Sequence, residues 1–520
     1  MSLLKNFATV GGATMASRLL GFVRDTLLAA AVGTGPVADA FVVAFRLPNL
    51  FRRLFAEGAF NSAFIPLFGR AVEEDGDDAA RKFAGEIGAG LLFCLLVLTA
   101  LAQIFMPAVV WALAPGFVGD TLKYDLTVLM SRIAFPYLVF MSMLAFIGGI
   151  LNTYQRFAAA AFAPVMLNVV MSLVLGGVIL SGVEDPYTLG VILTVGVTVA
   201  GIFQLLVVLW DLKRLGFRIP IYRPRYTKSA KRLLALGIPG VIAGGVTQIN
   251  VAVGQVIASL QDGANALLYY ADRLYQLPLG VIGIAIGVVL LPSLTRQLRA
   301  GHEDQYQRSL NNALEFSLVL TLPSAVALAV VPHEIVSVLF ERGRFDALAT
   351  EGTAAALAAF AFGLPAFVLN KVFSPGYFAR EDTKTPMWFA GIGMVANVAL
   401  SLAFFPFLQH VGIALATTIA GWLNTGLLVI VLWRRGHFRP DLTVLRKIAL
   451  ILVASALMGV AIHFAALGLA PWIAGTNFLI RVAGLAALVA TGMIVFGVFA
   501  QLSGGSNLVA HFRALKRRNT

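Results

Sequence analysis

The sequence is poor in charged residues and contains a single cysteine. Asp, Glu, Lys and Arg make up only 12% of the 520 residues, about half of the roughly 25% that is usual in soluble domains. With 59% hydrophobic residues and a mean hydropathy of +0.86, a chain of this length cannot form the polar surface of a soluble enzyme, so that class is excluded. Cys94 has no second cysteine to pair with, which excludes an intramolecular disulfide scaffold.

Signatures of catalysis and of metal binding are missing as well. The six histidines never stand at a metal-ligand spacing, and the chain has neither a nucleophile elbow nor a nucleotide-binding P-loop. We therefore expect no catalytic residue, no metal site and no cofactor, and a transporter rather than an enzyme. Without a nucleotide motif, transport would be driven by an ion gradient, by the membrane potential or by the gradient of the substrate itself. The sequence does not identify which ion would be coupled to transport.

Long apolar runs fill most of the chain. A bilayer core of roughly 30 Å needs about 20 apolar residues per helix. Fourteen runs meet this need, and the loops between them are short; the runs are residues 6–31, 37–66, 84–111, 124–151, 158–181, 187–210, 233–258, 265–295, 309–332, 350–373, 386–407, 411–433, 448–468 and 478–501. The sequence therefore predicts an all-α polytopic membrane protein with about 14 transmembrane helices.

Nine of the basic residues lie within the predicted spans, and the others lie almost entirely on one side of them. The 39 Lys and Arg residues outnumber the 26 Asp and Glu, for a formal net charge of +13. Alternate segments, beginning with the N-terminus, hold 27 of the basic residues, whereas the opposite side holds only Lys123, Arg342 and Arg344. This asymmetry is typical of an inner-membrane protein whose cytoplasmic loops are basic, so we expect both termini in the cytoplasm and no nucleic-acid partner.

A weak internal repeat suggests how the helices are grouped. Leu47-Pro48 in the second span corresponds to Leu277-Pro278 in the eighth, at an offset of 230 residues. The Tyr154 and Tyr377 loops, which lead into the fifth and eleventh spans, are also six spans apart. We interpret this as two six-helix lobes around a central cavity, residues 1–220 and 221–440, followed by a helix pair and a basic tail in residues 441–520. The alternative is coincidence, because proline is common at helix ends.

The most informative residues are the arginines at membrane depth. A charge at the bilayer centre costs on the order of 2.5–3.5 kcal/mol, so it must line water, pair with an acid or reach an interface. The first, second and eighth spans contain six arginines and four acids, an excess of two positive charges. The arginines are Arg18, Arg24, Arg46, Arg52, Arg53 and Arg273, and the acids are Asp25, Asp39, Glu57 and Asp272. Because the planar guanidinium can grip a diphosphate through two hydrogen bonds, the excess favours a polyanionic ligand. The alternative is that these residues form ion pairs that only fix helix packing.

The motifs around these residues resemble those of the MurJ (MviN) family of lipid II flippases. The resemblance rests on segments of the first, second and eighth spans and on a later loop, namely residues 17–25 (SRLLGFVRD), 38–41 (ADAF), 47–53 (LPNLFRR), 55–60 (FAEGAF), 270–274 (YADRL), 291–294 (LPSL) and 375–380 (PGYFAR). That family belongs to the multidrug/oligosaccharidyl-lipid/polysaccharide exporter superfamily. This chain departs from the family pattern at Gln276, where a family member carries an acid. The resemblance therefore does not imply a proton or cation role at this position.

The resemblance implies a task and a set of site residues. The task is the transfer of undecaprenyl-diphosphate-linked disaccharide-pentapeptide, lipid II, from the cytoplasmic to the periplasmic leaflet of the bacterial inner membrane for peptidoglycan synthesis. The implied partners are lipid II, membrane lipids and cell-wall synthesis proteins. The implied substrate-binding residues are Arg18, Arg24, Arg52 and Arg273. We assign gating and charge-pair roles to Asp25, Asp39, Arg53, Glu57 and Asp272. In the family the last two helices form a groove for the isoprenoid tail.

Two other functions compete with this interpretation. A cation-coupled multidrug or polysaccharide exporter of the same fold would present an acid-rich cavity to cationic drugs, and the arginine excess argues against it. A membrane glycosyltransferase would need catalytic carboxylates or a metal on the periplasmic side. The longest outward loop, residues 333–351, offers only acids without a recognisable spacing.

Overall fold

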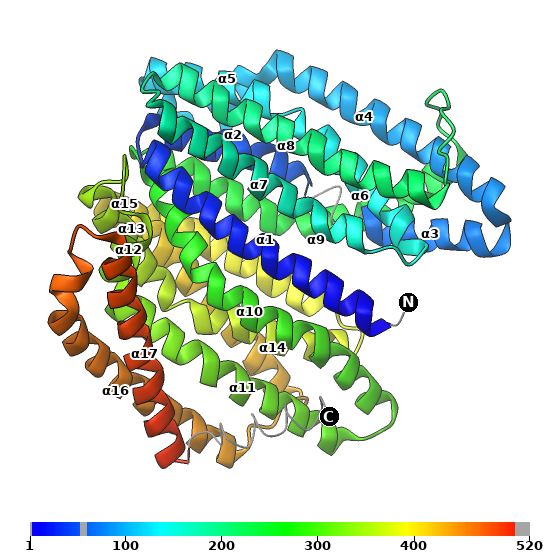
Figure 1. Cartoon of the computed structure of the whole chain (residues 1–520). Coiled ribbons are helices and arrows are strands. Elements are labelled where there is room, and N and C mark those ends of the chain that lie inside the picture. The colour runs from blue at the N-terminus through cyan, green and yellow to red at the C-terminus, as the bar shows by residue number, and fades with distance from the viewer. Residues whose placement is uncertain (1–2, 53–59, 505–520) are drawn as a thin grey trace. The chain divides into compact units, whose positions relative to one another are not determined.

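In a computed structural model, which describes residues 3–52 and 60–504, the chain is helical throughout and contains no strand in those residues (Figure 1). The helices are α1 (Leu3–Val32), α2 (Pro36–Phe51), α3 (Asn61–Glu74), α4 (Gly76–Leu113), the 3₁₀ helix η2 (Pro115–Gly119), α5 (Thr121–Ala134), α6 (Tyr137–Thr153), α7 (Ala158–Ser181), α8 (Pro186–Leu215), α9 (Lys228–Ala258), α10 (Ala264–Arg299), α11 (Glu303–Val330), α12 (Pro332–Phe340), α13 (Ala347–Ala361), α14 (Leu364–Phe378), α15 (Lys384–Arg434), α16 (Leu442–Ile473) and α17 (Phe478–Leu502).

The described helices include nine segments that are long and apolar enough to cross a membrane. Two of these segments, residues 121–153 and 347–378, each contain two consecutive helices, α5 with α6 and α13 with α14. The prediction of an all-α polytopic membrane protein is confirmed, whereas the count of 14 spans stays a prediction. Helices α1, α2, α9 and α10 fall outside the nine, and the first two of them carry the buried charges discussed below.

Helix α15 is a hairpin of two helices rather than one rod. A straight helix of its 51 residues would be about 77 Å long. However, Arg435 directly after its last residue lies 2.8 Å from Asp382, two residues before its first. The reversal occurs at Gln409, whose φ of 50° and ψ of −134° are not helical. The two arms therefore correspond to the separately predicted spans 386–407 and 411–433.

The chain separates into two compact units. Unit 1 comprises residues 1–266 together with 342–345, and unit 2 comprises residues 267–341 and 346–520. Helix α10 thus begins in unit 1 and continues in unit 2. The predicted boundaries at 220 and 440 stay a prediction.

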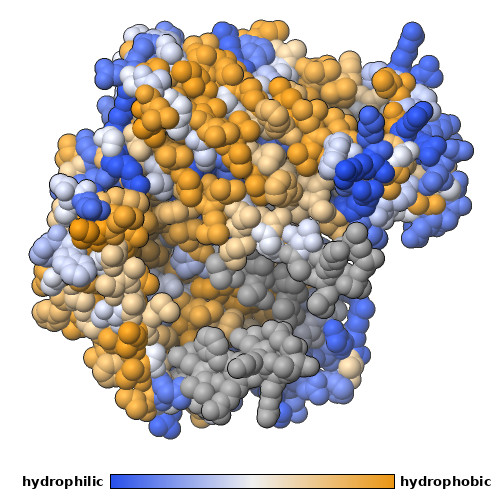
Figure 2. Space-filling model, viewed as in Figure 1, coloured by the Kyte–Doolittle hydropathy of each residue, from blue (hydrophilic) through white to orange (hydrophobic). Residues whose placement is uncertain are grey.

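Unit 1 exposes apolar side chains along its helices. Leu173 and Leu180 of α7 are 72% and 90% exposed, and Figure 2 shows hydrophobic side chains gathered over the middle of the α7 and α8 helices, with hydrophilic ones towards the helix ends. Inside the unit, Met106, Phe135 and Leu138 belong to a core cluster that joins α4 to the α5–α6 segment. An apolar exterior around a packed interior is what a lipid-facing bundle requires.

Unit 2 contains the paired helices α16 and α17. Their buried residues, among them Met458 and Leu488, form one cluster with Val319 of α11 and Val338 of α12. Lys447 of α16 adds an ion pair to Glu315 of α11 at 2.9 Å. The last two helices are therefore packed onto unit 2 by both apolar and ionic contacts.

Candidate functional site

Two of the predicted substrate-binding arginines lie on α1. The Arg24 guanidinium donates two hydrogen bonds to Oδ1 of Asp25, at 2.7 and 3.1 Å. Both side chains are largely buried, at 11% and 5% exposure. The predicted charge pair of Asp25 is thus formed with the neighbouring arginine, whereas Arg18, seven residues before Asp25, is half-buried without an ion pair among the described residues.

The position of Arg18 is set by contacts between α1 and α7. Asn168 of α7 donates to the carbonyl and hydroxyl oxygens of Ser17, at 2.8 and 3.2 Å. Its carboxamide lies 3.5 Å from where a Cβ on Gly21 would stand, so this glycine allows the close approach of the helices. The hydrogen bonds hold the backbone directly before Arg18 and thereby orient its helical turn.

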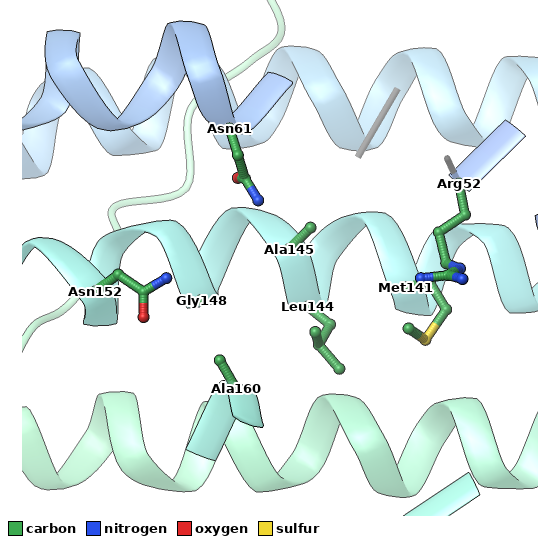
Figure 3. A pocket seen from close by; sticks show the side chains of 8 residues that line it. All are labelled: Arg52, Asn61, Met141, Leu144, Ala145, Gly148, Asn152 and Ala160. Carbon is green, nitrogen blue, oxygen red and sulfur yellow. The ribbon is translucent and has the colours of Figure 1, made fainter. Parts of the chain in front are cut away.

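Arg52 lies where α2 ends, beside a small cavity. Its Nε donates to Oδ1 of Asn49 at 3.1 Å, and the Asn49 amide donates to the Phe45 carbonyl at 2.9 Å. The cavity has a volume of about 140 Å³ (Figure 3), and its lining residues are Arg52, Asn61, Met141, Leu144, Ala145, Gly148, Asn152 and Ala160. A guanidinium at the edge of a partly polar cavity can bind an anion.

Asp39 is the centre of a buried polar network in unit 1. Its carboxylate is fully buried and lies 2.7 Å from the ammonium of Lys123, which is only 2% exposed. It also accepts hydrogen bonds from the backbone amides of Gly263 and Ala266, at 2.8 and 3.0 Å, where α10 begins. A carboxylate at this place satisfies amides that have no partner within the helix. Asp39 therefore ties α2 to α5 and to the first turn of α10.

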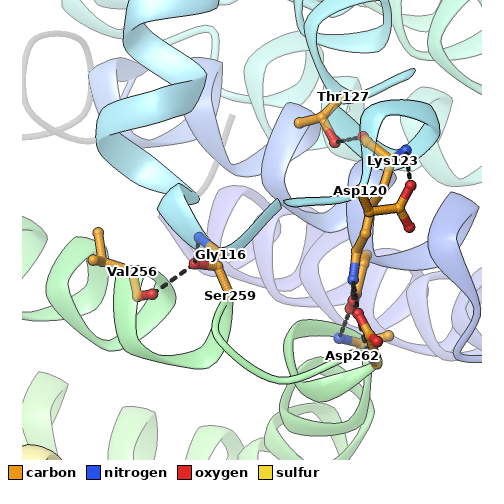
Figure 4. A network of polar contacts seen from close by, with 10 residues as sticks. Gly116, Asp120, Lys123, Thr127, Val256, Ser259 and Asp262 are labelled. Atoms are coloured by element: carbon orange, nitrogen blue, oxygen red, sulfur yellow. Dashed lines mark hydrogen bonds and ion pairs between the residues drawn. The ribbon is translucent and has the colours of Figure 1, made fainter. Parts of the chain in front are cut away.

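Lys123 extends this network to further elements (Figure 4). Its ammonium lies 3.0 Å from the exposed carboxylate of Asp262 and 4.3 Å from the centre of the Phe117 ring. Nearby, the Gly116 amide donates to the Ser259 hydroxyl at 3.1 Å, which joins η2 to the residue after α9. Two acids and an aromatic face thus surround one buried cation.

The segment 342–345 caps the end of α1. The Arg344 amide donates to the Ala30 carbonyl at 2.9 Å, and its guanidinium donates to the Val183 carbonyl at 2.9 Å. Gly33 has a φ of +60°, and a Cβ there would stand 2.2 Å from the Arg344 carbonyl oxygen. Glycine is therefore required at Gly33, both by its left-handed conformation and by the close approach of the segment.

Unit 2 holds the remaining predicted site residues. The Arg273 guanidinium lies 4.7 Å from the centre of the Tyr269 ring, a cation–π distance. Asp272 accepts a hydrogen bond from the amide of Gln276, the residue at which the chain departs from the family motif. This contact gives Gln276 a neutral role, as a donor to a carboxylate. Arg53 and Glu57 lie outside the described residues.

Several residues of these networks were not predicted as functional. Lys123 could have been noticed as one of only three basic residues assigned to the outward side. Asp262, Asn61 and Asn152 carry no comparable signal in the sequence, because each becomes part of a site only through tertiary contacts. Within the described part of the chain, no cluster of three or more His, Cys, Asp or Glu side chains could hold a metal ion.

Comparison with known proteins agrees with these features. A family model described as "Lipid II flippase MurJ" matches residues 28–483. The chain is 48% identical to a probable lipid II flippase MurJ of Rhizobium tropici over 520 residues, covering 100% of this chain and 97% of the relative. It is 36% identical to a lipid II flippase MurJ of Burkholderia cenocepacia over 475 residues, covering 90% and 91%.

Solved structures show the same fold. A structure of lipid II flippase MurJ in an inward closed conformation matches with a TM-score of 0.76 and 26% identity, covering 95% of this chain and 98% of that one. An inward-facing multidrug resistance transporter of the MATE family and the MOP superfamily matches with a TM-score of 0.58 and 15% identity, covering 84% and 94%. The second likeness is one of fold alone.

Proposed function

The chain belongs to the MurJ family of lipid II flippases, and from this membership we propose that it moves lipid II from the inner to the outer leaflet of the bacterial inner membrane. The observation that carries the proposal is the family match over nearly the whole chain, joined to arginines at the predicted membrane depth. The chain is a multi-pass membrane transporter and not an enzyme, with lipid II as substrate and membrane lipids as surroundings. We also propose that both termini lie in the cytoplasm and that the chain contacts cell-wall synthesis proteins.

The arginines bind the headgroup. Arg18, Arg24, Arg52 and Arg273 attract the diphosphate while the isoprenoid tail stays in lipid. Guanidinium groups suit this role because they remain charged in a partly dehydrated site and can each donate two parallel hydrogen bonds. The Arg24–Asp25 contact supports the role, since a positioned carboxylate keeps the guanidinium oriented before the substrate arrives.

Asp39 and Lys123 control the gate on the periplasmic side. The network holds the start of α10 against α2 and α5 through a fully buried carboxylate. Opening towards the periplasm would require these contacts to separate, and substrate binding would supply the free energy. Asp272, Arg53 and Glu57 take part in the charge pairs that change during the cycle, and the two lobes alternate between inward and outward access.

The membrane potential acts on the return of the empty carrier. An inside-negative potential opposes outward movement of an anionic headgroup but favours inward return of a cationic cavity. The effect is roughly 2.3 kcal/mol per charge per 100 mV. We therefore expect voltage to assist the return step.

Substitution of Arg273 tests the proposal. In cells that depend on this chain for cell-wall synthesis, Arg273→Ala should abolish rescue, because the cation is lost. Arg273→Lys should rescue only partly, because it keeps the charge but not the planar fork. The control is Arg299→Ala, which removes an exposed arginine from the same helix and should rescue fully. Full rescue by Arg273→Ala at matched expression would show that Arg273 does not bind the diphosphate.

A further inference from the structure

The cavity beside Arg52 has a shape and a set of lining groups that the binding of a diphosphate does not explain. Five of its lining residues, Met141, Leu144, Ala145, Gly148 and Asn152, follow one face of α6 at helical spacing. From Met141 to Asn152 the stripe covers 12 residues, a rise of about 16 Å along the helix axis. In Figure 3, Arg52 lies near Met141 at one end of this stripe, Asn152 at the other, and Asn61 of α3 between them.

Asn61 brings an unsatisfied hydrogen-bond acceptor to this cavity. Its Oδ1 is buried and has no hydrogen-bond partner among the described residues. A buried acceptor left without a donor costs roughly 1–3 kcal/mol in free energy, so its place in a cavity wall indicates a ligand that donates an N–H or O–H. The Asn152 carboxamide, which makes no side-chain hydrogen bond within the described residues, can donate to a ligand carbonyl from the same cavity.

The size of the cavity limits what can enter. Its volume of about 140 Å³ is close to that of an engineered protein cavity of about 150 Å³ that binds benzene. A disaccharide or a peptide is far larger, so only one substituent of such a headgroup can be accommodated. The walls formed by Leu144, Ala145 and Ala160 are apolar, which suits a methyl group.

We propose that this cavity is a recognition site for the acetamido group of a 2-acetamido sugar diphosphate. The N–H of that group donates to Asn61 Oδ1, its carbonyl accepts from the Asn152 amide, and its methyl contacts the apolar wall. The diphosphate and the acetamido group stand on adjacent ring carbons, so a sugar whose diphosphate is held by Arg52 carries its acetamido group into the neighbouring cavity. The inference rests on the proposed function and adds to it the feature by which the sugar is distinguished.

The test is a binding measurement on the purified full chain. The probes are prenyl diphosphates with a short, water-soluble prenyl chain. The first carries the 2-acetamido sugar, the second the same sugar with a 2-hydroxyl group, and the third the 2-hydroxy sugar with the peptide attached. Titration calorimetry gives the ratio of their dissociation constants. We expect the 2-acetamido probe to bind about tenfold more tightly than the other two, the effect of one to two buried hydrogen bonds.

Two variants locate this preference in the cavity. Asn61→Ala removes the acceptor, and Ala160→Leu fills the space without removing a polar group; each should reduce the preference to about twofold or less. Asn312→Ala, at an exposed asparagine of α11, should keep it. A tenfold preference that survives in both cavity variants, or one that follows the peptide instead of the acetamido group, would overturn the inference.

The same titrations separate this inference from the proposed function. If the wild type binds all three probes equally and Arg52→Ala weakens all of them, the diphosphate site stands and the acetamido site is wrong. If Arg52→Ala leaves the binding of every probe unchanged, the proposed role of Arg52 in binding the diphosphate is itself wrong.

Discussion

At the scale of single residues, Asp39 and Lys123 form a buried ion pair in unit 1. Both side chains are almost fully removed from solvent, and the carboxylate also accepts two backbone hydrogen bonds at the start of α10. Removing two charges from water is costly, and their mutual attraction offsets this cost only while both partners are present. Loss of both partners should therefore cost less than the sum of the two single losses.

A double-mutant cycle tests this expectation. Lys123→Met and Asp39→Asn should each lower the unfolding free energy by about 3–5 kcal/mol, whereas the double variant should lose clearly less than the sum of the two. Thermal unfolding of the purified protein measures the order of stability. Lys82→Met, at an exposed lysine of α4, is the matched control and should leave stability unchanged. Additive losses in the cycle would contradict a direct pairing.

The functional roles of the predicted site residues stay predictions. Arg24, Arg52 and Asp39 were identified as candidates because a charge within an apolar run is costly and therefore informative. The partner of Asp39 was not, because Lys123 lies at the start of α5 and reaches the carboxylate only through tertiary packing. Asn61 and Asn152 are uncharged, and neutral amides within a helix give no signal until a cavity forms around them.

At the scale of secondary-structure elements, the α15 hairpin is closed by an ionic contact between its two ends. Asp382 accepts hydrogen bonds from the hydroxyl and amide of Thr385 and lies 2.8 Å from Arg435. Partial burial acts to raise the pKa of Asp382, but the hydrogen bonds from Thr385 and the nearby Arg435 guanidinium outweigh it and lower the pKa from 3.8 to about 2. The carboxylate is therefore held in its charged form.

This contact makes stability depend on acid pH. Because the pKa of Asp382 is lower in the folded chain, its contribution is complete above the ordinary value of 3.8 and is lost as the pH falls through about 2. After allowance for solvent screening of a partly exposed pair, we expect Asp382→Asn to cost about 1 kcal/mol at pH 7 and only a small fraction of that near pH 2. Unfolding of both proteins across this range measures the difference.

The control for this measurement is Asp78→Asn. Asp78 is fully exposed and lies 3.6 Å from Arg81, so its replacement should leave the unfolding free energy unchanged at every pH. A stability difference between wild type and Asp382→Asn that stays constant from pH 7 to pH 2 would show that the carboxylate does not close the hairpin through its charge.

The apolar runs in the sequence predicted the positions of most of these helices, but not the points at which a predicted span is broken into two helices. The two arms of α15 were predicted as separate spans, because the polar residues Gln409 and His410 divide the apolar run. The run predicted as one span over 124–151 is instead divided into α5 and α6, which meet at Phe135 and Pro136. A break of this kind keeps the hydropathy of a single span, so hydropathy alone does not reveal it.

At the scale of the whole molecule, the charge asymmetry and the family membership lead to one account. The low charge content excludes a soluble enzyme, and a few of the charges that are present are arginines at the predicted membrane depth. The positive-inside pattern predicts on which side of the membrane each loop lies. The division at residues 220 and 440 stays a prediction, since a sequence repeat indicates equivalent helices and not the contacts that hold them in one unit. The account requires the chain to transfer lipid II between leaflets.

A leaflet-protection assay tests this central claim most directly. In cells depleted of their own lipid II flippase, an enzyme added from outside cleaves only the lipid II that has reached the outer leaflet. Expression of this chain should restore the cleaved fraction to the level before depletion, and Arg24→Ala at equal expression should not. If lipid II stays protected from cleavage in cells that express the wild-type chain, the account is contradicted.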